Sequence, residues 1–391
     1  MNDAASDQYK RRKTMNLWIP TAAFSVAVMI SGFGPQTEKA DQPILKDAFR
    51  THFLIGAALN DDVVAGKDPE AALLVQNQFN TITPENVMKW SLIHPEPDRY
   101  EFEPADRLVE FGQKNNMFVV GHTLLWHHQV PGWVFQDAGG KPADREALLK
   151  KMRDHIHTVV GRYKGRVHGW DVVNEALNED GTLRETAWLK IIGEDYIAKA
   201  FAYAHEADPE AELYYNDFSL ENEPKRNGAL TLVRKLQSQK IRITGVGLQG
   251  HYKMDWPSPV QVQTTIEAFA GLGMKVMITE LDMDVLPDPT GHQGADLSIR
   301  VERREEVDPY TGGLPDSVQL TLAERYDELF RVFVGQSDKL SRVTFWGVYD
   351  KMSWLNDWPV RGRTNHPLLF DRNYQPKPAF LAVVKTATRE K

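Results

Sequence analysis

Short β-rich runs alternate with longer helix-like segments from about Lys46 to the end of the chain. This alternation is typical of parallel βα units, because the helix after each strand carries the chain back across the sheet. Eight such runs predict a single α/β domain, a closed (β/α)8 TIM barrel. The candidate strands are 53–59, 81–85, 117–125, 167–174, 211–217, 243–251, 275–281 and 342–349.

The segments between these runs are long enough for amphipathic helices. Four of them have a proline near the expected start, where the missing backbone N–H costs no hydrogen bond. These prolines are Pro69, Pro104, Pro224 and Pro259. The candidate helices are 69–78, 104–115, 144–160, 185–205, 224–239, 259–271 and 320–335.

One segment, 284–318, breaks the alternation. It contains no convincing helix or strand over roughly thirty-five residues, which is far longer than an ordinary connection. We therefore expect a long loop after the seventh strand, placed where it overhangs any site at that end of the barrel. Its mixed-charge run, 300–306, is typical of a solvated face.

The N-terminal region has the character of a leader. A basic KRRK block at 10–13 precedes the uncharged segment 14–37. This pattern is typical of an export signal, and an uncleaved membrane anchor is the alternative because the uncharged segment is nearly long enough to span a bilayer. We expect a leader over 1–40, a catalytic domain over 41–391, and export to the periplasm, the cell surface or the medium. A cleaved leader would leave no stable membrane association.

Composition excludes several classes of function. The chain has 391 residues, 42% of them hydrophobic, so it can form a large core. Its formal net charge is −8 and it has no long basic block, which makes nucleic acid an improbable partner. The absence of cysteine rules out disulfides, thiolate metal sites and a catalytic thiol.

Polar residues gather at the C-terminal ends of the candidate strands. In barrels of this type that face carries the active site, whereas buried strand interiors should stay aliphatic. A chain built for packing alone would not repeat the pattern at seven strand ends. The residues are Glu85, Asn86, Lys89, His122, Trp126, Asn174, Glu175, Asn216, Asp217, Gln249, His251, Glu280, Asp282 and Trp346.

Two glutamates, Glu175 and Glu280, end β-rich runs that are far apart in the sequence. If they face one another across a cleft, one can protonate a leaving oxygen while the other attacks from the opposite side, as glycoside hydrolysis requires. The alternative for each is a structural ion pair with a nearby Arg or Lys. Because so many strands end in polar residues, a catalytic role for the two glutamates is favoured over structural ion pairs.

Six motifs in order, with a closing YQPKPAF at 374–380, resemble glycoside hydrolase family 10, the endo-β-1,4-xylanases. The motifs are TPENVMKW at 83–90, GHTLLWH at 121–127, WDVVNE at 170–175, GLQGHY at 247–252, ITELD at 278–282 and FWGVYDKMSW at 345–354. The resemblance implies a (β/α)8 barrel, endo-hydrolysis of xylan with retention of anomeric configuration, and neither cofactor nor metal. His128 and Leu355 stand where the family more often has Ser and Arg.

The resemblance implies that Glu175 is the general acid/base and Glu280 the nucleophile. His251 can hold the Glu280 carboxylate ionised while Asp282 orients the imidazole. Retention predicts that the two carboxyl groups lie about 5–5.5 Å apart. Because strict alternation would point Asn174 and Glu175 to opposite faces, we also expect a bulge or an early strand end there.

The remaining strand ends are expected to bind sugar. The resemblance places Glu85, Asn86 and Lys89 at the sugar on the non-reducing side of the reacting one. Around the reacting sugar we expect His122, Asn174 and Gln249, with Gln129 a further contact. Flat apolar faces come from Trp126, Trp346 and Trp354, and the last two could exclude the hydroxymethyl group of glucose.

Two other functions fit part of this pattern. A β-1,4-glucanase or mannanase would use the same barrel and glutamates, although Glu85, Asn86, Lys89 and Trp346 favour xylan. A sugar-binding barrel without activity would not need the complete catalytic set. We expect a monomer acting on xylan or xylo-oligosaccharides.

Overall fold

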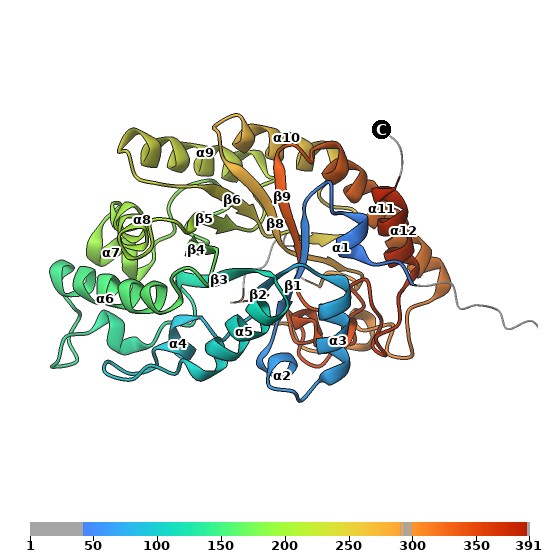
Figure 1. Ribbon diagram of the computed structural model, residues 1–391, viewed down its shortest axis with the longest axis horizontal. Helices are drawn as coiled ribbons and strands as arrows, with labels where there is room; N and C mark the ends of the chain where they lie inside the picture. The colour runs from blue at the N-terminus through green and yellow to red at the C-terminus, as the bar shows by residue number, and fades with distance from the viewer. Residues whose placement is uncertain (1–41, 290, 292–296, 298, 389–391) are drawn as a thin grey trace, which may run out of the picture. The chain divides into compact units, whose positions relative to one another are not determined.

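The eight β-rich runs form parallel strands that close into a barrel in the computed structural model (Figure 1). Pairing follows the order β6-β5-β4-β3-β2-β1-β9-β8, and β6 pairs with β8 to complete the ring. The predicted (β/α)8 fold is confirmed. The barrel strands are β1 (Leu54–Leu59), β2 (Thr81–Pro84), β3 (Phe118–Leu125), β4 (Gly169–Asn174), β5 (Glu212–Asp217), β6 (Gly245–Leu248), β8 (Lys275–Asp284) and β9 (Leu340–Phe345).

The structure describes residues 42–289, 291, 297 and 299–388. The expected leader, 1–40, therefore lies outside the described residues. Within the described ranges, no helix combines the length and the apolar character needed to cross a bilayer.

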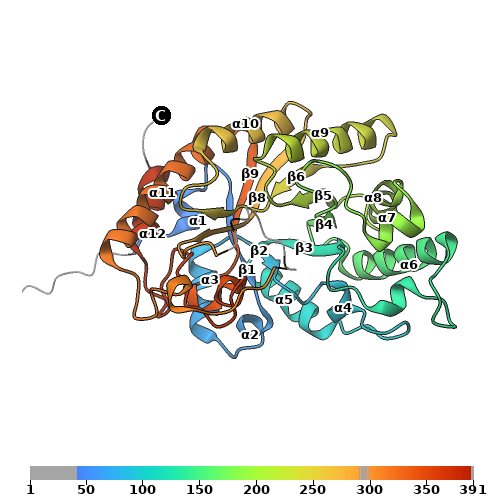
Figure 2. The same cartoon turned by 180° about the vertical axis from the view of Figure 1, so that it is seen from behind.

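Helices surround the strands, as Figures 1 and 2 show from opposite sides. Five of them have proline in the first two positions, including the four expected to start near a proline. Ser258 and Gln261 form a reciprocal capping box at one of these starts. The helices are α1 (Leu45–Ala48), α2 (Asp61–Val64), α3 (Pro69–Gln78), α4 (Trp90–Ile93), α5 (Glu103–Lys114), α6 (Arg145–Tyr163), α7 (Ala187–Ile192), α8 (Tyr196–Ala207), α9 (Glu223–Ser238), α10 (Pro259–Ala270), α11 (Asp316–Gly335) and α12 (Pro378–Ala387).

Two expected elements are each divided by a glycine. The run 243–251 forms β6 and a separate short strand, β7 (His251–Lys253), because Gly250 has a φ of 84°. The segment 185–205 forms α7 and α8, separated by Gly193 with a φ of 96°. Both angles lie in the left-handed region, which glycine enters without steric cost. The sequence pattern also missed the C-terminal helix α12, which packs against α11.

Residues of the barrel interior are less aliphatic than expected. Arg342 of β9 is buried and its guanidinium lies over the rings of Phe118 and Tyr214, which belong to strands on other sides of the barrel. Stacking on aromatic faces lets an arginine occupy an interior that a bare charge could not. Glycine provides space elsewhere, since a Cβ on Gly121 would lie 2.1 Å from the ring of Trp170.

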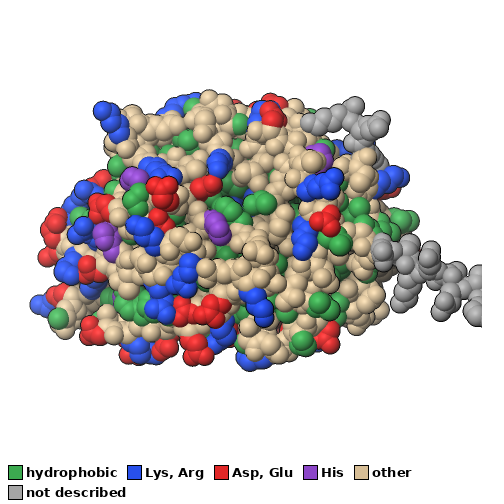
Figure 3. Space-filling view, viewed as in Figure 1, with side chains coloured by type: hydrophobic (Ala, Val, Ile, Leu, Met, Phe, Trp, Pro, Cys, Tyr) green, Lys and Arg blue, Asp and Glu red, His purple; other side chains and the backbone are tan. Residues whose placement is uncertain are grey.

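The long loop after β8 is present, and its described part is irregular apart from one short 3-10 turn, Glu305–Val307, and an isolated bridge between Val301 and Val360. Residues 302–306 are exposed, as the mixed-charge pattern predicted. The loop is tied to the segment after β9: Asp308 accepts a hydrogen bond from the Thr364 backbone N–H at 2.7 Å. On the face seen in Figure 3, basic and acidic side chains are interspersed.

Candidate active site

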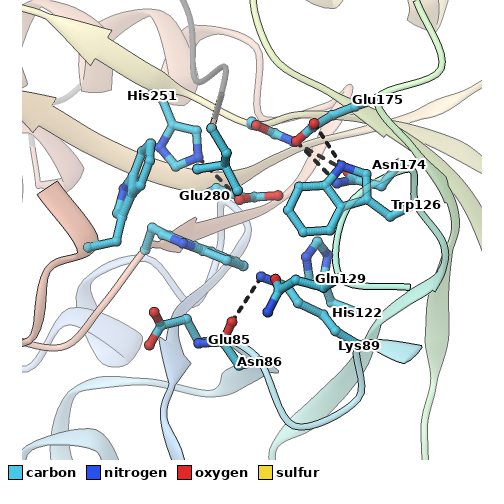
Figure 4. A pocket seen from close by; sticks show the side chains of 14 residues that line it. Glu85, Asn86, Lys89, His122, Trp126, Gln129, Asn174, Glu175, His251 and Glu280 are labelled. Atoms are coloured by element: carbon cyan, nitrogen blue, oxygen red, sulfur yellow. Dashed lines mark hydrogen bonds and ion pairs between the residues drawn. The ribbon is translucent and has the colours of Figure 1, made fainter. Parts of the chain in front are cut away.

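A cavity opens at the C-terminal ends of the barrel strands. The close view in Figure 4 shows the carboxyl groups of Glu175 and Glu280 facing into it. Every residue predicted to act in the site lines this cavity except Asp282, which is buried behind His251. Leu297, from the loop after β8, is also part of the wall. The lining residues are Glu85, Asn86, Lys89, His122, Trp126, Gln129, Asn174, Glu175, Gln249, His251, Glu280, Leu297, Trp346 and Trp354.

The backbone at Glu175 explains how Asn174 and Glu175 both reach the cavity. β4 ends at Asn174, and its pairing with β5 shifts register between Asp171 and Val173. Glu175 has a φ of 56°, a left-handed conformation that is uncommon for a residue with a Cβ. The predicted early strand end is confirmed.

The Glu175 carboxyl is surrounded by neutral hydrogen-bond donors. Trp126 donates its indole N–H to Oε2 at 2.7 Å, and the amides of Gln249 and Asn174 donate to Oε1 at 2.9 and 3.2 Å. Burial raises the pKa of Glu175, the negative charge of Asp217 raises it further, and the donors offset only part of this effect. The net pKa is raised, which favours the protonated acid.

The Glu280 carboxyl has one of its oxygens next to an imidazole. His251 Nε2 lies 3.2 Å from Oε2, and the Asn216 amide donates to Oε1 at 2.7 Å. Burial by itself raises the pKa of Glu280, but the hydrogen bond from His251, its charge and the Asn216 amide outweigh burial and lower the pKa. Glu280 is therefore held as a carboxylate.

Asp282 supports this arrangement from behind His251. Its Oδ1 lies 3.0 Å from His251 Nδ1, and its Oδ2 accepts the indole N–H of Trp354 at 2.7 Å. Burial lowers the pKa of His251, but the charge and hydrogen bond of Asp282 and the contact with Glu280 raise it to about 10. The chain of contacts expected for Asp282, His251 and Glu280 is present.

The expected strand end at Glu280 is wrong. β8 continues through Glu280 to Asp284 because β7, the short strand created by the break at Gly250, pairs with residues 282–284. Glu280 thus lies inside a strand, with its backbone N–H bonded to the Gln249 carbonyl at 2.6 Å. The rigid strand fixes the carboxylate more firmly than a loop would.

Asn216 links the two carboxyl groups and was not predicted as a site residue. Its amide donates to Glu280 Oε1 at 2.7 Å and to the Asn174 side-chain oxygen at 2.9 Å, while Asn174 donates to Glu175. Thr279 orients this amide through a 2.6 Å hydrogen bond to its oxygen. A signal existed, since Asn216 is the second-last residue of β5 and pairs with Asn174 of β4. The predicted carboxyl separation remains a prediction.

Glu85, Asn86 and Lys89 form one wall, directly after β2. Lys89 donates to the Asn86 amide oxygen at 3.1 Å, and its ammonium lies 4.9 Å from the centre of the Trp126 ring. Burial raises the pKa of Glu85 and lowers that of Lys89, and their mutual attraction offsets part of each shift. The wall offers both donors and acceptors, as a sugar with neutral hydroxyl groups requires.

Aromatic rings form the opposite wall. Trp346 meets the rings of His122 and His251 edge-on, at centroid distances of 5.3 and 6.2 Å. Trp354 stacks on Trp358, a neighbour that the sequence did not indicate, at 4.7 Å. His122 is oriented by Asp171, whose Oδ2 lies 2.9 Å from its Nδ1.

The structural alternative for the glutamates is not met in the part of the chain that the structure describes. There, neither Glu175 nor Glu280 forms an ion pair with an Arg or Lys side chain, and the partner of Glu280 is His251. Nor do the described residues contain a His, Asp and Glu group arranged to hold a metal ion. The site therefore consists of two carboxyl groups whose pKa values are shifted in opposite directions, inside a cavity lined by hydrogen-bonding side chains.

Comparisons with known proteins match this geometry. The sequence profile described as glycosyl hydrolase family 10 matches residues 44–386. The endo-1,4-beta-xylanase A of Xylanibacter ruminicola is 44% identical over 345 residues, which cover 88% of this chain and 94% of that protein. Solved structures include a GH10 endoxylanase retrieved from a sugarcane soil metagenome, with 46% identity, a TM-score of 0.85, and coverage of 87% and 99%. A mutant of an intracellular xylanase from Thermoanaerobacterium saccharolyticum, in complex with xylotriose, has 37% identity, a TM-score of 0.76, and coverage of 88% and 99%.

Proposed function

The chain belongs to glycosyl hydrolase family 10, and from this premise we propose that it is an endo-1,4-β-xylanase that cuts the xylan backbone with retention of configuration. The relatives support the substrate class, since they are named xylanases and one was solved with xylotriose. The cavity supports it as well, because its walls combine amide, carboxyl and ammonium groups with indole faces.

In the first step, Glu280 attacks the anomeric carbon of the sugar bound in the cavity. The glycosidic C–O bond breaks, and its electron pair goes to the leaving oxygen, which takes the proton of Glu175. A covalent glycosyl ester on Glu280 results, with inverted configuration. The shorter chain leaves with a free hydroxyl group.

In the second step, the Glu175 carboxylate takes a proton from a water molecule. The water oxygen attacks the same anomeric carbon, and the bond to Glu280 breaks, which restores its carboxylate. The second inversion returns the sugar to its original configuration. One water is consumed, and Glu175 again carries a proton.

The observation that carries this proposal is that the environments of the two carboxyl groups shift their pKa values in opposite directions. The pKa of Glu175 is raised and that of Glu280 is lowered within one cavity. Pairs of titratable groups whose environments separate their pKa values mark the acid and the nucleophile. The side-chain amides of Asn216, Asn174 and Gln249 donate hydrogen bonds to the two carboxyl groups and hold them in the cavity.

Proton NMR of an early digest tests the stereochemistry. Retention predicts that the β-anomer of the new reducing end appears first and mutarotates to the α-anomer afterwards. An α-anomer that appears first indicates inversion and contradicts the covalent step.

Reducing-sugar release from xylan, mannan and soluble cellulose tests the substrate class. The expected result is release mainly from xylan, with none above background for Glu280→Ala. Preference for mannan or cellulose would indicate another retaining glycosidase on the same barrel, and equal inactivity of both proteins would indicate a binding protein.

We also propose that residues 1–40 direct export. The basic block and the uncharged segment at the N-terminus support this, and so does the size of a xylan polymer. Family membership does not decide the compartment, since one structural relative is described as intracellular. N-terminal sequencing of protein recovered from each cell fraction tests the proposal.

A further inference from the structure

A buried ionic cluster lies directly behind Glu175. Asp217, the last residue of β5, and Lys225, in the first turns of α9, both have fully buried side chains, with 3.1 Å between Oδ1 and Nζ. Asp217 also accepts the Tyr215 hydroxyl at 2.5 Å and the Phe218 backbone N–H at 2.9 Å. Burial raises the pKa of Asp217, and the charge of Lys225 together with the hydrogen bonds from Tyr215 and Lys225 offsets part of this effect and favours the ionised carboxylate.

The cluster contacts the backbone on both sides of Glu175. The Tyr215 hydroxyl oxygen accepts the Ala176 N–H at 3.2 Å, and the Glu175 N–H is bonded to the Asn216 carbonyl at 2.9 Å. These two contacts lie on either side of Glu175, which has a left-handed backbone although it carries a Cβ. A side chain in such a conformation keeps its place only when its surroundings hold it there.

The cluster also reaches the carboxyl group of Glu175 through Gln249. The backbone carbonyl of Asp217 accepts the Gln249 N–H at 3.0 Å, and the Gln249 amide then donates to Glu175 Oε1 at 2.9 Å. Asp217 is therefore connected to Glu175 by two routes, one through Tyr215 to the backbone and one through Gln249 to the side chain.

Lys225 closes the cluster on its far side. Besides Asp217, its ammonium contacts Glu179 at 3.0 Å and lies 3.5 Å from the centre of the Phe218 ring. Glu179 is half exposed and belongs to the same loop as Glu175. The positive charge is thus held on the side of Asp217 that faces α9, while the negative end of the pair is nearer the cavity.

We propose that Asp217 is a positioning residue for the acid/base, which holds the loop of Glu175 in place and keeps Glu175 protonated until the glycosidic oxygen leaves. The inference rests on the proposed role of Glu175. No part of the catalytic steps requires Asp217 to touch the substrate.

The charges around Glu175 agree with this role. After burial, the charge of Asp217 is the largest cause that raises the pKa of Glu175, and Glu280 on β8 acts in the same direction. Lys89 attracts the ionised form, and Arg184 donates to the backbone carbonyl oxygens of Glu175 and Leu177, at 3.3 and 3.2 Å. His251 and His122 stand on the side of Glu280.

The test is the pH dependence of kcat/KM for Asp217→Asn, which keeps the shape but removes the charge. Loss of protonated Glu175 sets the basic limb of the profile, so removal of a nearby negative charge is expected to move that limb to lower pH. The acid limb, set by Glu280, should stay in place. Near neutral pH, kcat/KM should fall several-fold on xylan and less on an aryl xylobioside with a dinitrophenol leaving group, which departs without a proton.

The matched control is Asp350→Asn. Asp350 is also fully buried and paired with a buried lysine, Lys377, at 3.0 Å, but it lies after β9 and does not line the cavity. Losing one partner of a buried pair should destabilise both variants. Only Asp217→Asn is expected to move the basic limb.

A double variant, Asp217→Asn with Lys225→Met, serves if the single variant does not fold. It removes both charges of the pair, so neither is left buried and unpaired. The basic limb should still move to lower pH, by less than in the single variant because the positive charge of Lys225 is lost as well. A basic limb that coincides with the parent in a folded variant overturns the proposal and makes Asp217 structural only. Glu175→Gln separates this outcome from failure of the proposed function: if that variant keeps full activity on xylan, Glu175 is not the acid at all.

Discussion

The surroundings of Glu175 and of Glu280 differ in kind although the two side chains are almost equally buried, at 6% and 4% exposure. The carboxyl group of Glu175 accepts hydrogen bonds from neutral donors, and the charges of Asp217 and Glu280 raise its pKa, whereas Glu280 faces an imidazole held by a second carboxylate. Burial acts on both in the same direction. The partners therefore decide which carboxyl keeps its proton.

The two residues also differ in how the backbone holds them. Glu175 follows a strand and has a left-handed backbone, which is fixed by contacts from two residues of β5: the Asn216 carbonyl and the Tyr215 hydroxyl. Glu280 lies within β8 and is fixed by the regular pairing of its strand. Glu280, the proposed nucleophile, is therefore part of the barrel wall, and Glu175, the proposed acid/base, lies just beyond the end of its strand.

The largest effect should come from Glu280→Ala. Removing the nucleophile blocks the covalent step, so kcat on xylan is expected to fall by about 10⁴-fold or more. Added azide should restore turnover of an activated aryl xylobioside and yield the α-glycosyl azide, because one inversion remains. A β-product from this variant would assign the nucleophile elsewhere.

Glu175→Ala should cost less and should depend on the leaving group. Loss of the general acid is expected to lower kcat/KM on xylan by about 10²- to 10⁴-fold. With a dinitrophenol leaving group the first step needs no proton, and azide should then give the β-glycosyl azide. Equal losses on both substrates would break the contrast between the two carboxyl groups.

His251→Asn tests the charge that distinguishes the Glu280 side. His251 lowers the pKa of Glu280, so its removal should raise that pKa and move the acid limb of kcat/KM to higher pH. The loss in activity should be about tenfold to a hundredfold, the effect of one charge-assisted hydrogen bond of about 1.5–3 kcal/mol. The basic limb, which belongs to Glu175, serves as the internal control.

His251→Asn should also change the pH dependence of the stability of the protein. The pKa of His251 is raised from 6.5 to about 10 in the folded protein, so its contribution to the free energy of unfolding is complete below about pH 6.5 and disappears as the pH rises through about 10. The difference in Tm between the parent and His251→Asn should narrow across this range. A constant difference would mean that His251 stays neutral.

The smallest effect is expected for Trp346→Ala, which changes the shape of the cavity and not its charge. Trp346→Ala removes an indole that lines the cavity and meets the rings of His122 and His251. The ratio of xylan to cellulose activity is expected to fall by about tenfold or less, because the site gains room for a hydroxymethyl group. An unchanged ratio would show that this wall does not select the sugar, and both pH limbs should stay in place.

The barrel, the position of the cavity and the end of the strand before Glu175 could be predicted from the sequence. The period of the β-rich runs predicted the barrel, and the polar strand ends predicted the cavity, because parallel strands bring their C-terminal ends to one face. The backbone at Glu175 followed from side-chain alternation: two adjacent residues can face one cavity only where a strand ends or bulges.

Other features depend on tertiary contacts that no local pattern carries. Glu280 was expected at a strand end, but β8 continues because β7 pairs with it. The roles of Asn216 and Asp217 were missed because each depends on neighbours from other strands and from α9. Trp126 was expected to present a flat face, and its N–H contact with Glu175 appears only when β3 and β4 are placed side by side.

The short amide connection between the two glutamates has a consequence for timing. In the proposed reaction, esterification of Glu280 abolishes its charge, and with it the repulsion that helps Glu175 to retain a proton. The pKa of Glu175 then falls. This occurs after Glu175 has given its proton to the leaving oxygen, when its carboxylate must act as the base for water. Formation of the neighbouring covalent bond thus removes one of the causes that raise the pKa of Glu175 and favours the proposed exchange of roles.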